Sequence, residues 1–120
     1  MGNMTEQRTG GCHCGTVRYE VEIDLTKPVI ECNCSHCQAK GLLLSAVPSE
    51  NLVISEGEGN LTEYNFNTEK IRHFFCKTCG VQPFARGKGD AAAGSMINVR
   101  TIDDIDLDSL TRLPFDGKSR

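Results

Sequence analysis

The chain has 120 residues, of which 38% are hydrophobic and 24% are charged, as in a single globular domain. A formal charge of −3 disfavours binding to a nucleic-acid backbone, because proteins that do so concentrate lysine and arginine. No apolar stretch reaches the ~18 to 20 residues that span a bilayer, and residues 1–9 lack the apolar centre of a signal peptide. We therefore expect a cytoplasmic protein that has neither a nucleic acid nor a membrane as a partner.

The first predicted strand covers residues 17–23, where apolar and charged residues alternate. A period of two is typical of a half-buried strand. Further short runs with β character, separated by Gly, Pro, Asn and Asp, are residues 29–34, 42–47, 52–55, 61–66, 71–75 and 96–99. Short strands at this spacing predict an all-β sandwich or barrel-like domain.

Helices contribute little to this prediction. No segment carries an apolar stripe over three helical turns, although residues 103–113 can form a short turn of helix. Residues 87–90, Gly-Lys-Gly-Asp, are typical of a hairpin loop rather than of a domain boundary. The sequence therefore predicts one domain.

Seven cysteines form three clusters, which are Cys12 and Cys14, then Cys32, Cys34 and Cys37, then Cys76 and Cys79. A reducing compartment disfavours disulfides, so clustered thiols there indicate a metal site or a redox site. In an extended segment, residues i and i+2 project to the same face, so each Cys-x-Cys pair can bind one ion. The Cys-x-x-Cys pair followed by glycine has the spacing of a zinc knuckle.

Zinc in structural sites takes four ligands in a tetrahedron, and only one partition keeps every cluster whole. The two pairs, Cys12, Cys14, Cys76 and Cys79, make a closed structural site. The triplet of Cys32, Cys34 and Cys37 is left with three thiolates and a vacant position, as in catalytic zinc sites. We thus predict two zinc ions per chain. The alternative of a redox dithiol at the last pair usually comes with a βαβ context, which this sequence does not show.

The predicted open site suits thiol chemistry. Three thiolates weaken zinc as a Lewis acid, so the site is better fitted to hold an incoming thiol as a thiolate than to generate hydroxide. His36, inside the triplet, leaves three interpretations: a fourth ligand, a hydrogen-bond partner of the group in the vacancy, or a solvated loop histidine. Ser35 and Gln38 can hydrogen-bond the sulfurs, although serine in such a turn is more often a backbone cap.

Other polar and aromatic residues near the last pair have two interpretations. Arg72, His73 and Arg86 can meet an anionic substrate, or they can be solvated strand residues. The aromatic residues are predicted to form core around the structural zinc, and they are Phe74, Phe75 and Phe84.

Four motifs together resemble those of the glutathione-dependent formaldehyde-activating enzyme (GFA) family. They are Gly-Gly-Cys-His-Cys-Gly from Gly10, Cys-Asn-Cys-Ser-His-Cys-Gln from Cys32, Phe-Cys-Lys-Thr-Cys-Gly-Val-Gln-Pro-Phe from Phe75, and Phe-Asp-Gly from Phe115. The similarity spans residues 9–118, after a tail of residues 1–8. It implies a β-tent fold of antiparallel sheets stapled by zinc, with a structural zinc on the outer pairs and a catalytic zinc on the triplet.

The resemblance also implies an activity. The family joins glutathione and formaldehyde as S-hydroxymethylglutathione, which is carbon–sulfur lyase or synthase chemistry. By this analogy the partner is a small thiol such as glutathione, and the catalytic residues are Cys32, Cys34, Cys37 and His36. No motif assigns a residue to glutathione contact.

Two alternative functions would use the same cysteines in other ways. A non-catalytic, zinc-stabilised binding module would have His36 or a partner's group in the vacancy. Centromere-type relatives of the family show that the scaffold need not serve metabolism, but this acidic chain lacks the basic tails that chromatin-associated versions would need. Zinc-dependent deamination requires Glu two residues after the first ligand and a Pro-Cys-x-x-Cys segment, and the sequence has neither.

Overall fold

The computed structural model describes residues 5–65, 71–87 and 93–116, and within them the fold is all-β, as predicted. A three-stranded sheet has the order β1-β2-β5, and a seven-stranded sheet has the order β10-β3-β4-β9-β8-β7-β6. The strands are β1 (Glu6–Gly11), β2 (Arg18–Ile23), β3 (Val29–Cys32), β4 (Leu44–Pro48), β5 (Leu52–Glu56), β6 (Leu61–Tyr64), β7 (Ile71–Cys76), β8 (Phe84–Gly87), β9 (Gly94–Asn98) and β10 (Arg112–Phe115). All neighbours pair antiparallel except β3 and β10, which are parallel.

The core lies between the two sheets. On β2 the residues Tyr19, Val21 and Ile23 are buried, whereas the glutamates between them are exposed, which confirms the predicted alternation. These side chains pack against buried residues of the larger sheet, among them Phe84 on β8 and Ile97 on β9. Burial of this apolar surface is the main favourable contribution to folding.

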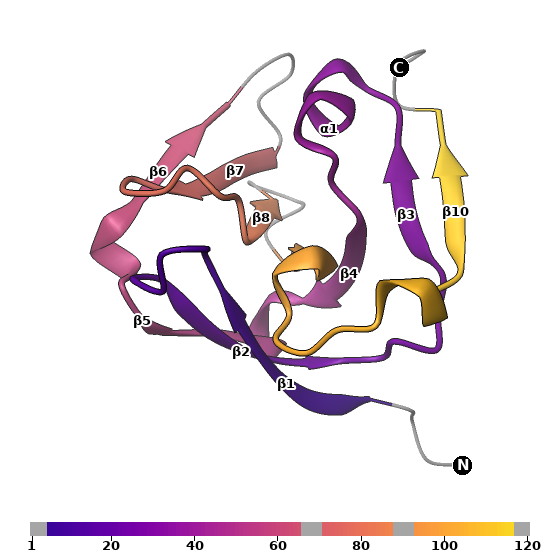
Figure 1. Ribbon diagram of the computed structural model, residues 1–120, viewed down its shortest axis with the longest axis horizontal. Coiled ribbons are helices and arrows are strands. Elements are labelled where there is room, and N and C mark those ends of the chain that lie inside the picture. The colour runs from indigo at the N-terminus through magenta and orange to yellow at the C-terminus, as the bar shows by residue number, and fades with distance from the viewer. Residues whose placement is uncertain (1–4, 66–70, 88–92, 117–120) are drawn as a thin grey trace.

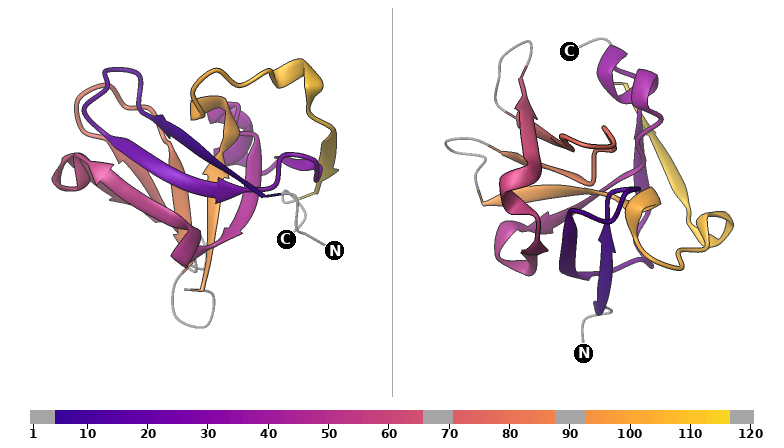
Figure 2. Two further views of the ribbon diagram at one scale, coloured as in Figure 1. Left: turned by 90° about the horizontal axis from the view of Figure 1, so that it is seen from below. Right: turned by 60° about the vertical axis from the view of Figure 1, so that its left-hand side comes forward.

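The larger sheet curves so that its two ends approach each other, and α1 (Ser35–Lys40) lies between them (Figures 1 and 2). In Figure 1, β3 and β10 stand on one side of α1, and β6 and β7 stand on the other. The helix is short because Gly41, which follows it, has a positive φ of 68° and a backbone N–H that donates to the carbonyls of Cys37 and Gln38. Glycine adopts this left-handed conformation readily, and it ends helices for this reason.

Several elements differ from the sequence prediction. The strands β1, β8 and β10 and the helix α1 were not predicted, and the strand predicted over residues 29–34 ends at Cys32. The structure has one 3₁₀ turn within residues 103–113, η5 (Leu107–Ser109), and β10 begins before that segment ends.

Some predicted features fall outside the described residues. They are Phe66 of the sixth predicted strand, residues 88–90 of the predicted hairpin loop, and the two ends of the predicted domain and tail. The strands on either side of that loop, β8 and β9, do pair antiparallel. No helix in the described part of the chain is long and apolar enough to cross a bilayer.

Candidate metal centres

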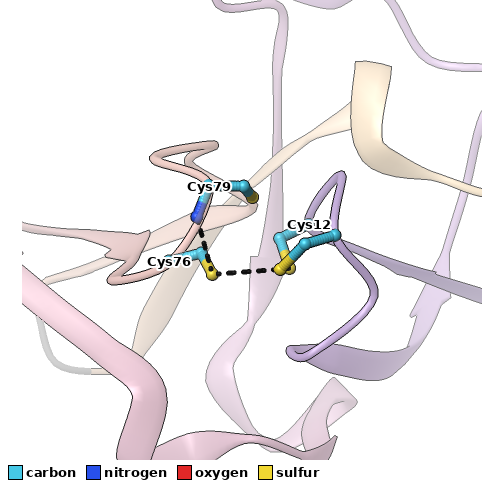
Figure 3. A group of neighbouring side chains, drawn as sticks. Cys12, Cys76 and Cys79 are labelled. Atoms are coloured by element: carbon cyan, nitrogen blue, oxygen red, sulfur yellow. Dashed lines mark hydrogen bonds between the residues drawn. The ribbon is translucent and has the colours of Figure 1, made fainter.

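Four cysteines converge where the two sheets meet. The sulfur atoms of Cys12, Cys14, Cys76 and Cys79 all lie within 4.8 Å of one another. Figure 3 shows Cys12, from the turn between β1 and β2, facing Cys76 and Cys79, from the end of β7 and the turn after it. We call these four residues the closed group.

The local backbone explains how the first pair converges. Cys12 and Cys14 lie in a turn, not in the extended segment that was predicted, and the Cys12 amide donates to the Val17 carbonyl at 3.1 Å. This close approach requires glycine beforehand, since a Cβ on Gly11 would collide with the same Val17 carbonyl. The extended backbone predicted for this pair is therefore wrong. The turn nevertheless brings the two sulfurs to 3.5 Å from each other, close enough to share one ion.

Hydrogen-bond donors surround the sulfurs of the closed group. Cys76 Sγ accepts from the amides of Thr78 and Cys79, at 3.3 and 3.5 Å, and from Asn60 Nδ2 at 3.4 Å. Burial raises the pKa of Cys76, but these amides and the neighbouring thiols outweigh it and lower that pKa to about 6. Backbone amides also lower the pKa of Cys79 against the effect of burial, whereas burial raises the pKa of Cys12. Cys76 and Cys79 are therefore the members that favour thiolate, the form that binds metals.

The spacing of the sulfurs fits one tetrahedral ion. Zinc–sulfur bonds of about 2.3 Å place the corners of a tetrahedron about 3.8 Å apart. The sulfurs of Cys14 and Cys76 are 3.7 Å apart, and none of the seven cysteines forms a disulfide. The closed group therefore offers a complete ligand set for a metal ion.

The second group of sulfurs has three members. The Sγ atoms of Cys32, Cys34 and Cys37 lie within 4.8 Å of one another, at the end of β3, in the next turn and inside α1. Cys34 is the N-cap of α1, and its Sγ accepts from the Cys37 amide at 3.4 Å. We call these residues the open group, because among the described residues no His, Asp or Glu joins them to make a fourth ligand.

Two members of the open group, Cys34 and Cys37, differ in their tendency to ionise. Burial raises the pKa of Cys34, but hydrogen bonds from the amides of Cys37 and His36 and from neighbouring thiols outweigh it, so that this pKa is lowered. Burial raises the pKa of Cys37, and its thiol neighbours raise it further. A bound cation would reverse this effect, since metal coordination deprotonates thiols.

A cavity of about 330 Å³ borders the open group. Cys32 and Cys37 form part of its wall, and Leu42 adds an apolar surface. Its remaining lining residues are exposed and polar or small, and they are Glu31, Asn33, Gln38, Gly41 and Arg100. The cavity therefore connects the open group with solvent.

A comparison with known protein families identifies the family of this chain. The family model described as glutathione-dependent formaldehyde-activating enzyme matches residues 7–112. The chain belongs to the GFA family. It also resembles a crystal structure of a Rhodobacter sphaeroides protein, with 30% identity, a TM-score of 0.78, and coverage of 88% of this chain and 97% of that one.

The GFA match includes both cysteine groups and thus every ligand residue predicted from the sequence. His36 lies within the matched range too, but it does not join the three sulfurs, and its ring contacts β6 and β7 instead. Its ring lies 4.1 Å from that of His73 and 5.7 Å from that of Tyr64, measured between centroids. The interpretation of His36 as a solvated loop residue is therefore wrong, and it is not part of the three-sulfur group.

The polar residues predicted near the two cysteine groups differ in their positions in this GFA domain. Gln38 lines the cavity, whereas the cap of α1 is Cys34 and not Ser35. His73 is buried, contrary to the prediction of a solvated strand residue. The guanidinium carbon of Arg72 lies 5.5 Å from the centre of the Phe74 ring, and that of Arg86 lies 5.3 Å from the centre of the Phe84 ring.

The predicted aromatic core around the closed group is wrong. Phe74 and Phe84 stack on each other, with centroids 5.3 Å apart, in the main core between the sheets. The centre of the Phe75 ring lies 5.1 Å from the ammonium nitrogen of Lys40. The closed group packs instead against aliphatic residues, which are Val17, Leu61 and Val81.

Sequence reasoning missed three polar residues at these centres. Asn60 donates to Cys76 Sγ, and Glu31 and Arg100 line the cavity. Asn60 and Arg100 are remote in sequence from the cysteines that they approach, and neither belongs to a spacing motif. Glu31 directly precedes Cys32, which was the available signal.

Proposed function

We propose that the protein is a zinc-dependent carbon–sulfur lyase or synthase that acts on a small thiol adduct, such as S-hydroxymethylglutathione. The observation that carries this proposal is the open group of three sulfurs on the wall of a solvent-connected cavity. A structural zinc site would have no need of such a cavity. Membership of the GFA family supports the thiol and aldehyde as reactants.

Zinc is the metal that the donor sets favour. Both groups consist of thiolates, which select zinc, copper(I) or iron–sulfur clusters over hard cations such as magnesium. Cys12, Cys14, Cys76 and Cys79 would hold the structural ion, and Cys32, Cys34 and Cys37 would hold the second one. Free thiols at all seven positions suit a reducing compartment, so a cytoplasmic location is part of the proposal.

The reaction adds a thiol across the carbonyl group of formaldehyde. The sulfur forms a bond to carbon, the carbonyl π bond breaks, and the oxygen takes up the proton that the thiol gives up. A zinc ion bound by three protein thiolates supplies a position that holds and orients a thiol as its thiolate. The chain contributes the cavity wall, where Gln38 offers an amide group to hydroxyl or carbonyl oxygens.

In the alternative function, a non-catalytic binding module, the same cysteines bind zinc but no reaction takes place at the open group. In one version of it His36 completes the open group, and the contacts of His36 with His73 and Tyr64 do not support that version. In the other version a partner's side chain enters the cavity. A test of catalysis therefore separates the two functions.

Exchange NMR spectroscopy tests the proposal directly. Glutathione and ¹³C-formaldehyde interconvert with S-hydroxymethylglutathione spontaneously, and we expect the zinc-loaded protein to accelerate this exchange. Cys34→Ala is the matched control, because it should lose the acceleration while the closed group keeps its zinc. Exchange at the spontaneous rate with two zinc ions per chain bound would contradict the catalytic function.

A further inference from the structure

The cavity beside the open group carries one positive and one negative side chain, Arg100 and Glu31. Its volume of about 330 Å³ is at the lower end of the range, about 300 to 1,000 Å³, that holds small-molecule ligands. A ligand whose sulfur approached Cys32 and Cys37 would therefore have its other groups near these two charges. This makes the charges candidates for selecting the ligand.

Arg100 is held in position by its backbone and by its side chain. It lies in the 3₁₀ turn η4 (Val99–Thr101), where its amide donates to Oδ1 of the N-cap Asn98 at 3.3 Å. Its Nε donates to the carbonyl of Gly41 at 2.8 Å, so the guanidinium is fixed at the end of α1, the helix that carries Cys37.

The rest of the guanidinium is available to a ligand. Across residues 5–65, 71–87 and 93–116, the structure gives Arg100 no ion pair with a carboxylate and no hydrogen bond from Nη1 or Nη2. A guanidinium presents a planar fork of N–H donors that matches a carboxylate with two parallel hydrogen bonds. One edge of Arg100 is thus anchored to the protein, and the other is free to bind an anion.

The positive charge of Arg100 can offset electrostatic repulsion between the site and an anionic ligand. Three cysteine thiolates outweigh the charge of one divalent ion, and the whole chain has a formal charge of −3, so an anionic thiolate meets repulsion as it approaches. A fixed cation in the cavity offsets that repulsion for a ligand that also carries a carboxylate. A neutral thiol gains nothing comparable.

We propose that Arg100 determines the substrate class by binding a carboxylate of the thiol, so that the site takes thiols derived from amino acids, such as glutathione, in preference to neutral thiols. Glu31, on the same wall, forms an ion pair with Arg112 at 3.7 Å, so the proposal gives the selecting role to Arg100 alone. This proposal rests on the proposed function for its substrate, but the binding of the carboxylate does not require catalysis.

Binding of S-methylglutathione tests the proposal without any reaction, because its sulfur is blocked while its carboxylates are intact. Titration by calorimetry or NMR should show that Arg100→Gln weakens binding about tenfold or more, as expected for loss of a hydrogen-bonded charge. Arg100→Lys should recover part of the affinity, since it restores the charge without the fork. Arg8→Gln, on β1, removes the same charge away from the cavity and should bind as the wild type does.

Kinetics separate this proposal from the proposed function. If the exchange reaction is accelerated, Arg100→Gln should lower kcat/KM for glutathione about tenfold and leave kcat/KM for 2-mercaptoethanol unchanged. Equal affinity of wild type and folded Arg100→Gln for S-methylglutathione, or no binding by the wild type, would overturn the role of Arg100 even if catalysis is found. Binding that depends on Arg100 without accelerated exchange would support that role and remove the catalytic function instead.

Discussion

His73 lies where α1 meets β7, in surroundings that disfavour its charged form. It is 7% exposed, and its Nδ1 is 3.3 Å from Nε2 of Gln82. Because Oε1 of Gln82 accepts from Lys40 Nζ at 2.7 Å, the amide nitrogen of Gln82 faces His73 and donates to an unprotonated Nδ1. Burial, followed by the charges of His36 and Lys40, lowers the pKa of His73 to about 4.

This pKa predicts a pH dependence of stability. In the unfolded chain the histidine titrates near pH 6.5, so below that pH the unfolded state binds a proton that the folded state binds only near pH 4. The contribution of His73 to stability is complete above pH 6.5 and is lost as the pH falls toward 4. Its slope is at most about 1.4 kcal/mol per pH unit.

Urea unfolding of wild type and His73→Phe between pH 4 and 7.5 measures this contribution. Phenylalanine keeps a ring beside His36 but does not titrate, so the variant should lose less stability than the wild type between pH 6.5 and 4. Acid also protonates the metal ligands of both proteins, and the comparison removes that shared effect. Parallel curves for the two proteins would show that His73 is not the titrating group.

At the scale of elements, the sequence predicted strands well where each strand buries one face. The alternation over β2 follows from its position against the core, so period and burial coincide. By contrast β1 is polar along most of its length and depends on its pairing with β2, and β10 is exposed and contains Pro114. Pairing with a neighbour across the sheet leaves no periodic signal in such strands.

The cysteine spacing predicted both metal groups, but not how the chain builds them. A six-residue helix is too short for an apolar stripe, so α1 was missed although it carries Cys37. Arg100 was missed as well, because it reaches the cavity through a contact with Gly41, 59 residues earlier. Ligand identity is local in sequence, whereas the lining of a cavity depends on the whole topology.

The end of β10 holds the loop that carries the open group. Asn33, between Cys32 and Cys34, donates from its backbone N to the Phe115 carbonyl and from Nδ2 to Oδ1 of Asp116, both at 3.1 Å. This contact joins the last described strand to the middle of the open group. It therefore fixes the direction in which the sulfurs on either side of Asn33 point.

We expect Asp116→Ala to weaken zinc binding at the open group about tenfold, the lower end of the ~10- to 100-fold effect of losing residues that orient metal ligands, because Asp116 acts through Asn33. The thermal unfolding temperature should change little, because Asp116 is exposed. Chelator competition for the more weakly bound zinc gives the affinity. Asp108→Ala, which removes an equally exposed carboxylate on η5, is the control. Equal zinc affinity in the two variants would mean that the contact with Asn33 does not orient the group.

At the scale of the whole molecule, the two groups act over very different distances. The closed group joins the β1–β2 turn to the end of β7, and Cys14 and Cys76 are 62 residues apart in the chain. A metal there ties the smaller sheet to the larger one. The open group lies within residues 32–37, so a metal there constrains only a strand end and the first turn of α1.

This difference predicts opposite results for two equivalent substitutions. Zinc binding by small structural sites contributes on the order of 10 kcal/mol, comparable with the about 5 to 15 kcal/mol that stabilises a whole domain. Cys12→Ala or Cys79→Ala should therefore abolish soluble folding. Cys34→Ala should leave a folded protein with about half of the wild-type zinc, because the sheets stay joined.

Zinc content by mass spectrometry, together with circular dichroism, distinguishes these outcomes, and Cys34→Ala serves as the matched control for the loss of a thiol. The comparison is informative because both substitutions remove the same atoms, so a different effect must come from where the metal joins the chain. A Cys34→Ala protein that unfolds would mean that the open group also supports the fold. A Cys79→Ala protein that folds and keeps half of its zinc would mean that the core between the sheets is sufficient without the closed group.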